Sequence, residues 1–144
     1  MTDSTIDHDQ LFKQLLSTFF IEFLELFFPQ VASQIEPDSV SFLPQEYFAD
    51  LTTGETKIID LLAQVRLAGQ AVGFIIHIEA QATSRSNFPQ RMFFYFARLH
   101  QTYLQLIYPI VIFSFDEPYR EEPNQYLVEF DDLKVLEFNF HTIQ

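Results

Sequence analysis

The sequence predicts an α/β domain in which a central, mixed β-sheet is flanked by helices. Three observations support this fold class. A helical pattern opens the chain, two apolar strand patterns follow around a tight turn, and a second helical pattern leads into another short apolar strand. A helix that connects two strands in this way is typical of a parallel pair within one sheet. The expected order is therefore α-β-β-α-β, followed by a β-rich tail.

The first helix is predicted over residues 7–28. Asp7 or Asp9 can cap its start, and Pro29 is expected to end it. Its large apolar residues recur in pairs every fourth position and build one wide stripe. A stripe wider than one small domain can cover would favour a homodimer. The stripe comprises Leu11, Phe12, Leu15, Leu16, Phe19, Phe20, Phe23, Leu24, Phe27 and Phe28.

The next elements are a hairpin and a second helix. Residues 57–67 and 71–81 read as two strands rich in Ile, Val, Leu and Phe, joined by a turn at Ala68-Gly69-Gln70. Residues 88–108 have a helical pattern that Pro109 is expected to break. Short strands are predicted at 40–43, 110–115, 125–130 and 134–141, the second of them buried as in a parallel sheet.

Length and composition fit one folded domain over residues 1–144. Hydrophobic residues make up 48% of the chain, which is enough for a core, and the absence of cysteine excludes disulfides and thiolate metal sites. The chain lacks a secretory signal and the roughly 20 apolar residues that span a membrane, so we expect a soluble cytoplasmic protein. Because the last residues still resemble a strand, we expect the natural protein to continue past Gln144.

Two carboxylates interrupt the apolar hairpin strands. Asp60 lies in Ile58-Ile59-Asp60-Leu61-Leu62, and Glu79 lies in His77-Ile78-Glu79-Ala80-Gln81. A buried carboxylate needs a metal, a partner or a raised pKa. A hairpin closed near Gly69 places Asp60 opposite Ile78 and one step from Glu79. Two carboxylates that converge from adjacent strands form a site suited to Mg²⁺ or Mn²⁺.

These residues resemble the D…(D/E)-x-K signature of PD-(D/E)XK nucleases, with Gln81 where lysine is usual. The Glu-x-Gln form, together with flanking segments, is similar to the Rpn family of recombination-promoting nucleases, which are also described as transposases. The resemblance runs from about residue 7 to 130. Its flanking segments are Asp9-Gln-Leu-Phe12-Lys13, Phe88-Pro-Gln-Arg91-Met-Phe-Phe-Tyr95-Phe-Ala-Arg98-Leu and Tyr108-Pro-Ile-Val-Ile-Phe-Ser114.

The resemblance implies a restriction-endonuclease-like sandwich and a Mg²⁺-dependent DNA endonuclease. Asp60 and Glu79 would hold the ion together with the carbonyl of Ala80, and Gln81 would position a water. In the wider fold the signature lysine orients or activates that water, whereas Gln81 carries no charge. Lys13 or Arg91 would have to supply the missing cation and contact DNA.

Several alternatives remain open at this stage. His77 reads as a hydrogen-bonded core imidazole, or as an additional metal ligand or phosphate contact. The chain carries 8 Lys and Arg against 20 Asp and Glu, and this net charge of −12 opposes long-range attraction to DNA. The charge and the missing lysine favour the main alternative, a non-catalytic binding or regulatory module with the nuclease fold.

Overall fold

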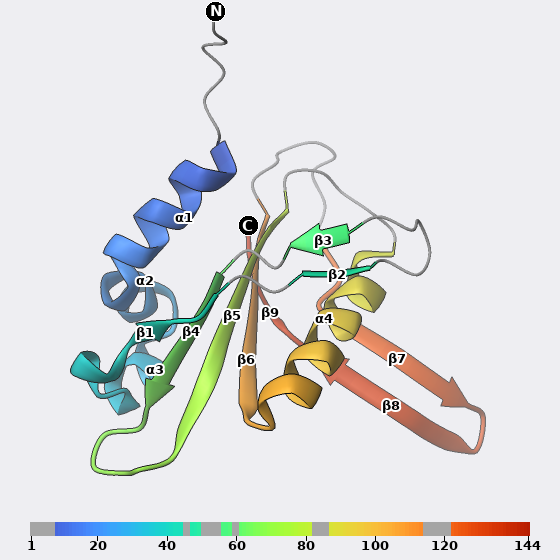
Figure 1. Ribbon diagram of the computed structural model, residues 1–144. Coiled ribbons are helices and arrows are strands. Elements are labelled where there is room, and N and C mark those ends of the chain that lie inside the picture. The colour runs from blue at the N-terminus through green and yellow to red at the C-terminus, as the bar shows by residue number, and fades with distance from the viewer. Residues whose placement is uncertain (1–7, 45–46, 50–55, 59–60, 82–86, 114–121) are drawn as a thin grey trace, which may run out of the picture.

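The computed structural model describes residues 8–44, 47–49, 56–58, 61–81, 87–113 and 122–144. In this part of the chain a five-stranded sheet forms the centre, and helices cover both of its faces (Figure 1). The predicted α/β fold, a restriction-endonuclease-like sandwich around a mixed sheet, is confirmed. In spatial order the strands are β1 (Ser41–Phe42), β4 (Leu61–Arg66), β5 (Gly73–Gln81), β6 (Leu106–Phe113) and β9 (His141–Ile143).

The sheet combines antiparallel and parallel pairs. Strands β1 and β4 are antiparallel, as are β4 and β5, whereas β5 is parallel to β6 and β6 is parallel to β9. Helix α4 (Phe88–Tyr103) connects β5 to β6, which confirms the predicted crossover between a parallel pair. The carboxyl ends of β5 and β6 therefore lie at the same edge of the sheet.

The first helical segment is divided rather than continuous. It forms α1 (His8–Thr18), α2 (Phe20–Phe27) and α3 (Pro29–Gln34), so the single helix predicted over 7–28 is wrong in this respect. The hydroxyl of Ser17 donates to the carbonyl of Lys13 at 2.8 Å, a contact that often bends helices. Pro29 ends α2 but also starts α3, because proline is compatible with the first turn of a helix.

The apolar stripe of this segment is only half covered. The buried residues on α1 and α2 are Leu16, Phe20 and Leu24, which recur every fourth position and pack on the sheet. The other side of the stripe remains exposed in the described structure. Its exposed members include Leu11 at 46%, Leu15 at 54% and Phe19 at 54%.

Helix α4 ends earlier than the sequence predicts. Leu104 adopts the left-handed conformation with φ of 54°, and its N–H donates to the carbonyl of His100, which closes the helix. Pro109, predicted to break this helix, instead lies inside β6. Pro109 pairs with His77 in the β5–β6 ladder, and strand β9 pairs with β6 only from Ile110 onward.

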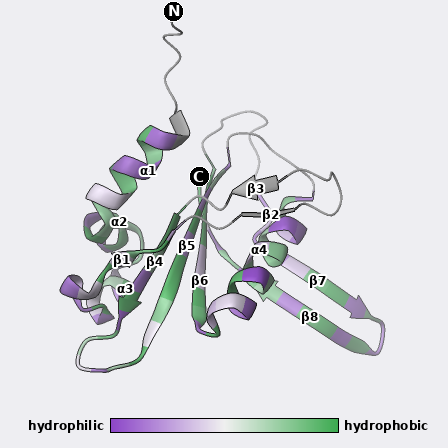
Figure 2. Ribbon diagram, in the orientation of Figure 1, coloured by the Kyte–Doolittle hydropathy of each residue, from purple (hydrophilic) through white to green (hydrophobic). Residues whose placement is uncertain are grey.

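Two hydrophobic clusters lie on opposite faces of the central sheet. One contains Leu62, Ile75 and Val111 and is covered by α4, whereas the other contains Ala63, Ile76 and Ile78 and is covered by α1 and α2. Figure 2 shows that the central strands are hydrophobic along most of their length, as expected for strands covered on both faces. Odd-numbered residues of β5 thus face α4, and even-numbered ones face α1 and α2.

Two small antiparallel pairs complete the described structure. Strands β2 (Tyr47–Ala49) and β3 (Thr56–Ile58) pair apart from the central sheet, so the strand predicted over 57–67 is divided. Strands β7 (Gln125–Phe130) and β8 (Leu133–Asn139) form a hairpin, and β9 continues from the same predicted strand into the central sheet. A short 3-10 helix (Pro37–Ser39) precedes β1.

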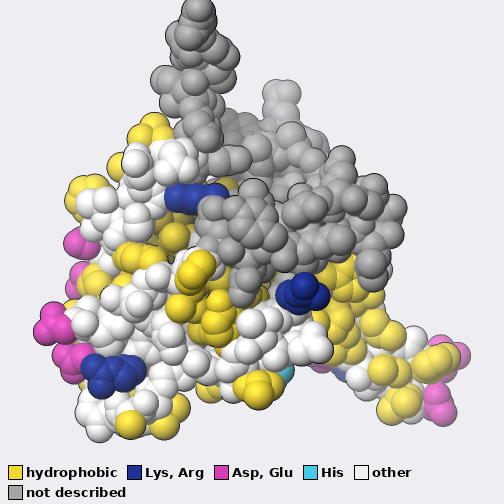
Figure 3. Space-filling view, in the orientation of Figure 1, with side chains coloured by type: hydrophobic (Ala, Val, Ile, Leu, Met, Phe, Trp, Pro, Cys, Tyr) yellow, Lys and Arg dark blue, Asp and Glu magenta, His cyan; other side chains and the backbone are white. Residues whose placement is uncertain are grey.

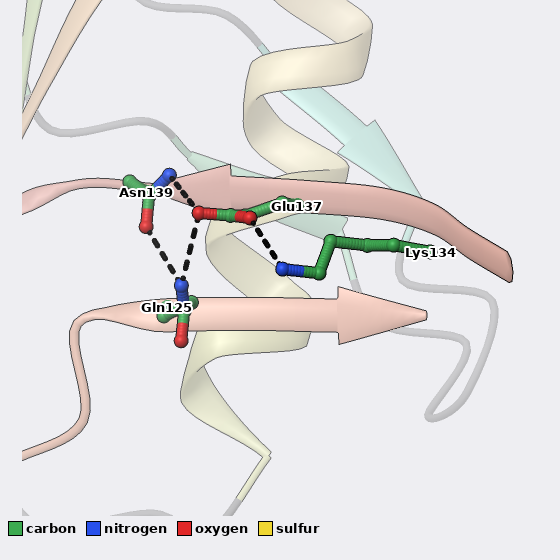
Figure 4. A network of polar contacts seen from close by, with 4 residues as sticks. All are labelled: Gln125, Lys134, Glu137 and Asn139. Atoms are coloured by element: carbon green, nitrogen blue, oxygen red, sulfur yellow. Dashed lines mark hydrogen bonds and ion pairs between the residues drawn. The ribbon is translucent and has the colours of Figure 1, made fainter. Parts of the chain in front are cut away.

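The β7–β8 hairpin carries a polar network on one face. Glu137 accepts hydrogen bonds from Lys134, Gln125 and Asn139 at 3.0, 3.3 and 3.3 Å (Figure 4). These contacts lower the pKa of Glu137, with the hydrogen bond from Lys134 as the largest cause. The other face packs on α4 through Tyr126 and Phe138.

No helix in the described part of the chain is both long and apolar enough to cross a membrane.

Candidate active site

The site is built on strand β5, which brings His77 and Glu79 to the face covered by α4. The two residues are separated by one position, so their side chains project from the same face of the strand. His77 Nε2 lies 3.0 Å from Glu79 Oε1. His77 is fully buried and Glu79 is only 5% exposed. An ionisable side chain is thus held inside the central sheet.

The histidine gives this carboxylate a specific polar partner. An ionised carboxylate only accepts hydrogen bonds, so in that state His77 Nε2 must carry the proton and donate it. Such a bond offsets part of the cost of burying the charge. His77 is therefore a hydrogen-bonded imidazole in the core, which was one of the two interpretations of this residue from the sequence. It also contacts Glu79, a candidate site residue.

Helix α4 extends this arrangement through Tyr95. The ring of Tyr95 meets the imidazole of His77 edge to face, with centroids 6.0 Å apart and planes at 81°. Arg91, one helical turn earlier, donates from Nη2 to the hydroxyl oxygen of Tyr95 at 3.3 Å. The guanidinium is thus connected through Tyr95 to the imidazole that bonds Glu79. Tyr95 was not among the predicted site residues, although its spacing of four from Arg91 places both on one side of a helix.

Asp60, the second predicted carboxylate, lies outside the described residues. The described register nevertheless corrects one prediction about it, because Ile78 pairs with Leu61 and not with Asp60. This shift of the register by one position changes which residues of β4 lie on the same face of the sheet as a given residue of β5. Leu62, an even-numbered residue of β4, pairs with His77 and joins the same cluster as Ile75. Even-numbered positions of β4 thus share a face with odd-numbered positions of β5.

The other predicted site residues are distributed over both sides of the sheet. Gln81 is the last residue of β5, is half-buried and pairs with Phe113 of β6. Arg91 is half-buried on α4, the helix that covers the Glu79 face. Lys13 is half-buried on α1, which packs on the opposite face. The structure thus brings Arg91, rather than Lys13, to the layer that contains Glu79.

Much of the acidic charge of the described residues lies away from Glu79. Glu22 and Glu25 are exposed on α2, on the opposite face of the sheet, and Asp131 and Asp132 are exposed at the turn of the β7–β8 hairpin. In Figure 3 the acidic side chains gather toward α2 and α3 and at the tip of the hairpin. These four carboxylates of the described residues therefore do not place negative charge next to Glu79.

The donor chemistry fits a divalent cation of the Mg²⁺ type. Glu79 supplies a carboxylate oxygen from a rigid central strand, and hard cations prefer oxygen ligands. Within the described residues, no group of three or more His, Cys, Asp or Glu side chains could hold a metal. A complete ligand set would therefore require Asp60 or backbone oxygens in addition to Glu79.

A cavity of about 470 Å³ lies at the other end of the β4–β5 ladder. Its lining includes Arg66 and Gly73, which form the last described pair before the hairpin turn. Glu79 instead follows Ile78, whose pairing with Leu61 is at the opposite end of that ladder. The cavity and the candidate active site are therefore separate features.

The family comparison agrees with this arrangement. A model of a family described as "PD-(D/E)XK nuclease family transposase" matches residues 7–126, which is most of the chain. The match includes α1, the β4–β5 hairpin, α4 and β6, and therefore contains all the elements that build the candidate site. Neither the curated proteins nor the solved structures contain a match.

Proposed function

Because this chain belongs to the PD-(D/E)XK nuclease family of transposases, we propose that it is a metal-dependent DNA endonuclease acting in recombination or transposition. The supporting observation is the buried carboxylate of Glu79, held by His77 on the central strand of the sheet. A protein seldom buries a carboxylate without a structural or chemical use for it. We take residues 1–144 as one nuclease-like domain and the cytoplasm as its location.

In this proposal Asp60 and Glu79 hold one Mg²⁺ or Mn²⁺ ion, with the carbonyl of Ala80 as a further ligand. Asp60 directly precedes Leu61, and Glu79 directly follows Ile78, the pairing partner of Leu61. The parity of the described ladder favours a common face for the two carboxylates. When bound, the ion supplies an activated water and stabilises the charge that develops on the phosphate.

The remaining roles follow from charge and hydrogen-bonding capacity. Gln81 orients the attacking water through its side-chain amide but carries no charge. Arg91 is the cation proposed to contact the DNA phosphate, because α4 lies on the same side of the sheet as Glu79. A guanidinium can donate two parallel hydrogen bonds to phosphate. Lys13 is proposed to contact the DNA backbone farther from the reacting phosphate.

Cleavage of supercoiled plasmid tests the proposed activity. The parent protein is expected to nick the plasmid with Mg²⁺ or Mn²⁺ and to lose this activity in EDTA. Asp60→Ala should abolish cleavage, because it removes one of the two carboxylates proposed to bind the ion. Exposed Asp38→Ala is a matched control, since it removes a carboxylate beside β1 at a distance from β5 along the sheet. Unchanged cleavage by Asp60→Ala would reject Asp60 as a catalytic residue.

A second function, a non-catalytic binding or regulatory module, is favoured by two observations. Gln81 replaces the usual lysine, and the exposed part of the α1–α2 stripe, which includes Leu11, Leu15 and Phe19, would suit a homodimer. This function predicts a protein that does not cleave DNA with either metal, even as Gln81→Lys. It also predicts a dimer by sedimentation, which Leu15→Glu should convert to a monomer.

A further inference from the structure

The contact between His77 and Glu79 has a geometry that core packing alone does not require. A buried imidazole can hydrogen-bond to any nearby backbone carbonyl, yet Nε2 of His77 is directed to the carboxylate two residues along the same strand. Glu79 is the residue for which the proposed function requires a fixed position. The Nε2–Oε1 distance of 3.0 Å is within the range of a direct hydrogen bond.

The imidazole is itself held in place by helix α4. Its centroid lies 6.0 Å from that of Tyr95, and the 81° angle between the planes makes the contact edge to face. Tyr95 is 6% exposed, and its hydroxyl accepts a hydrogen bond from Arg91. The three side chains therefore couple the orientation of His77 to α4, which is anchored by fully buried Met92 and Leu99.

We propose that His77 is a positioning residue that fixes the Glu79 carboxylate for metal binding, and that Tyr95 holds the His77 ring for this purpose. This inference rests on the proposed nuclease function. Residues that hydrogen-bond to metal ligands restrict their orientation, and their loss commonly weakens metal affinity by about 10- to 100-fold. His77 does not contact the ion in this proposal. It acts through Oε1 of Glu79.

The experiment compares Mn²⁺ affinity by isothermal titration calorimetry in three His77 variants. His77→Leu removes the donor, and His77→Phe also removes it but retains an aromatic ring against Tyr95. His77→Gln retains a donor, because its amide nitrogen lies about as far from the backbone as the imidazole Nε2. His100→Leu is the matched control, since His100 is exposed near the end of α4. Circular dichroism establishes that each variant is folded.

We expect His77→Leu and His77→Phe to weaken Mn²⁺ binding at least about 10-fold. His77→Gln should stay within a few-fold of the parent, and His100→Leu should equal it. In metal-free protein, the carboxyl ¹³C resonance of Glu79 should shift in the Leu and Phe variants and remain near its parent position in the Gln variant. This resonance reports on the hydrogen bond independently of cleavage.

The possible contrary results separate the two proposals. A parent protein that binds Mn²⁺ as tightly as folded His77→Leu or His77→Phe would overturn the positioning role and leave the metal site intact. Equal weakening by His77→Gln and His77→Leu would also overturn it, because core packing alone would then account for the loss. A parent that binds no Mn²⁺ would overturn the metal site itself, and the positioning role with it.

Discussion

Gln81 ends strand β5 on the face that carries His77 and Glu79. Strand alternation gives all three side chains one direction, and the sequence is sufficient to predict this common face. The burial of Glu79 was also predictable, because its neighbours Ile78 and Ala80 belong to an apolar strand. The contact of His77 with Tyr95 was not, since it depends on how α4 packs across the sheet.

Gln81 variants test what the uncharged side chain at this position contributes to cleavage. Gln81→Ala should retain metal binding and lose only part of the rate, because a neutral hydrogen bond to water contributes about 1–3 kcal/mol. Gln81→Lys should keep or raise the rate, because an ammonium can stabilise the developing phosphate charge. Single-turnover cleavage with saturating Mn²⁺ provides the measurement. A Gln81→Ala variant that no longer binds Mn²⁺ would contradict the role assigned to this side chain.

Among the elements, the β4–β5 hairpin was predictable from composition, but its register was not. The turn residues indicate the position of the hairpin turn to within a residue or two. A difference of one residue, however, decides which side chains of the two strands lie on the same face. The pairing of Leu61 with Ile78 therefore required the structure. The end of α4 was mispredicted for a different reason: Leu104 takes the left-handed conformation usually reserved for glycine or asparagine.

Gly73 has a defined role in this hairpin. A Cβ at this position would lie 2.5 Å from the carbonyl oxygen of Val65, which belongs to the backbone and cannot rotate away. Gly73→Ala should therefore destabilise the protein by about 1–3 kcal/mol, as overpacked sites do. Urea unfolding monitored by circular dichroism measures this change in the free energy of unfolding.

The matched control is Gly69→Asn in the turn of the same hairpin. Gly69 has φ of 74° and open space around its Cβ position, and asparagine tolerates the left-handed region better than most residues. Its cost should be clearly smaller than that of Gly73→Ala. Equal stabilities of the parent and Gly73→Ala would contradict the close approach of β4 and β5 at this point.

Over the whole molecule, helices on both faces of the mixed sheet produce two separate cores, and ring contacts join the N-terminal helical segment to the last strand. Phe28, between α2 and α3, packs on His141 of β9, with centroids 5.1 Å apart. Tyr108 of β6 also packs on His141 at 4.9 Å. The sequence predicted strand character at 134–141 but could not assign β9 to the central sheet, because that pairing joins distant parts of the chain.

This contact gives the stability of the protein a pH dependence. His141 remains exposed, but its neighbours partly desolvate it and lower its pKa from the ordinary value of 6.5, so the unfolded chain takes up a proton that the folded protein resists. The free energy of unfolding should therefore decrease as the pH is lowered from 6.5 through the folded-state pKa. His141→Phe keeps an aromatic ring and should show a shallower decrease in urea unfolding between pH 7 and 5. Identical pH profiles for the parent and this variant would show that His141 is not the source of the pH dependence.

The central claim is that the two carboxylates of the β4–β5 hairpin hold one divalent ion. Titration of the protein with Mn²⁺, followed by electron paramagnetic resonance of the free ion, tests this most directly. The parent should bind one Mn²⁺ per chain. Asp60→Asn and Glu79→Gln should each lose that site, because each replaces a negatively charged carboxylate ligand by a neutral amide of similar size. A parent that binds no Mn²⁺, or variants that bind it as tightly as the parent, would contradict the claim.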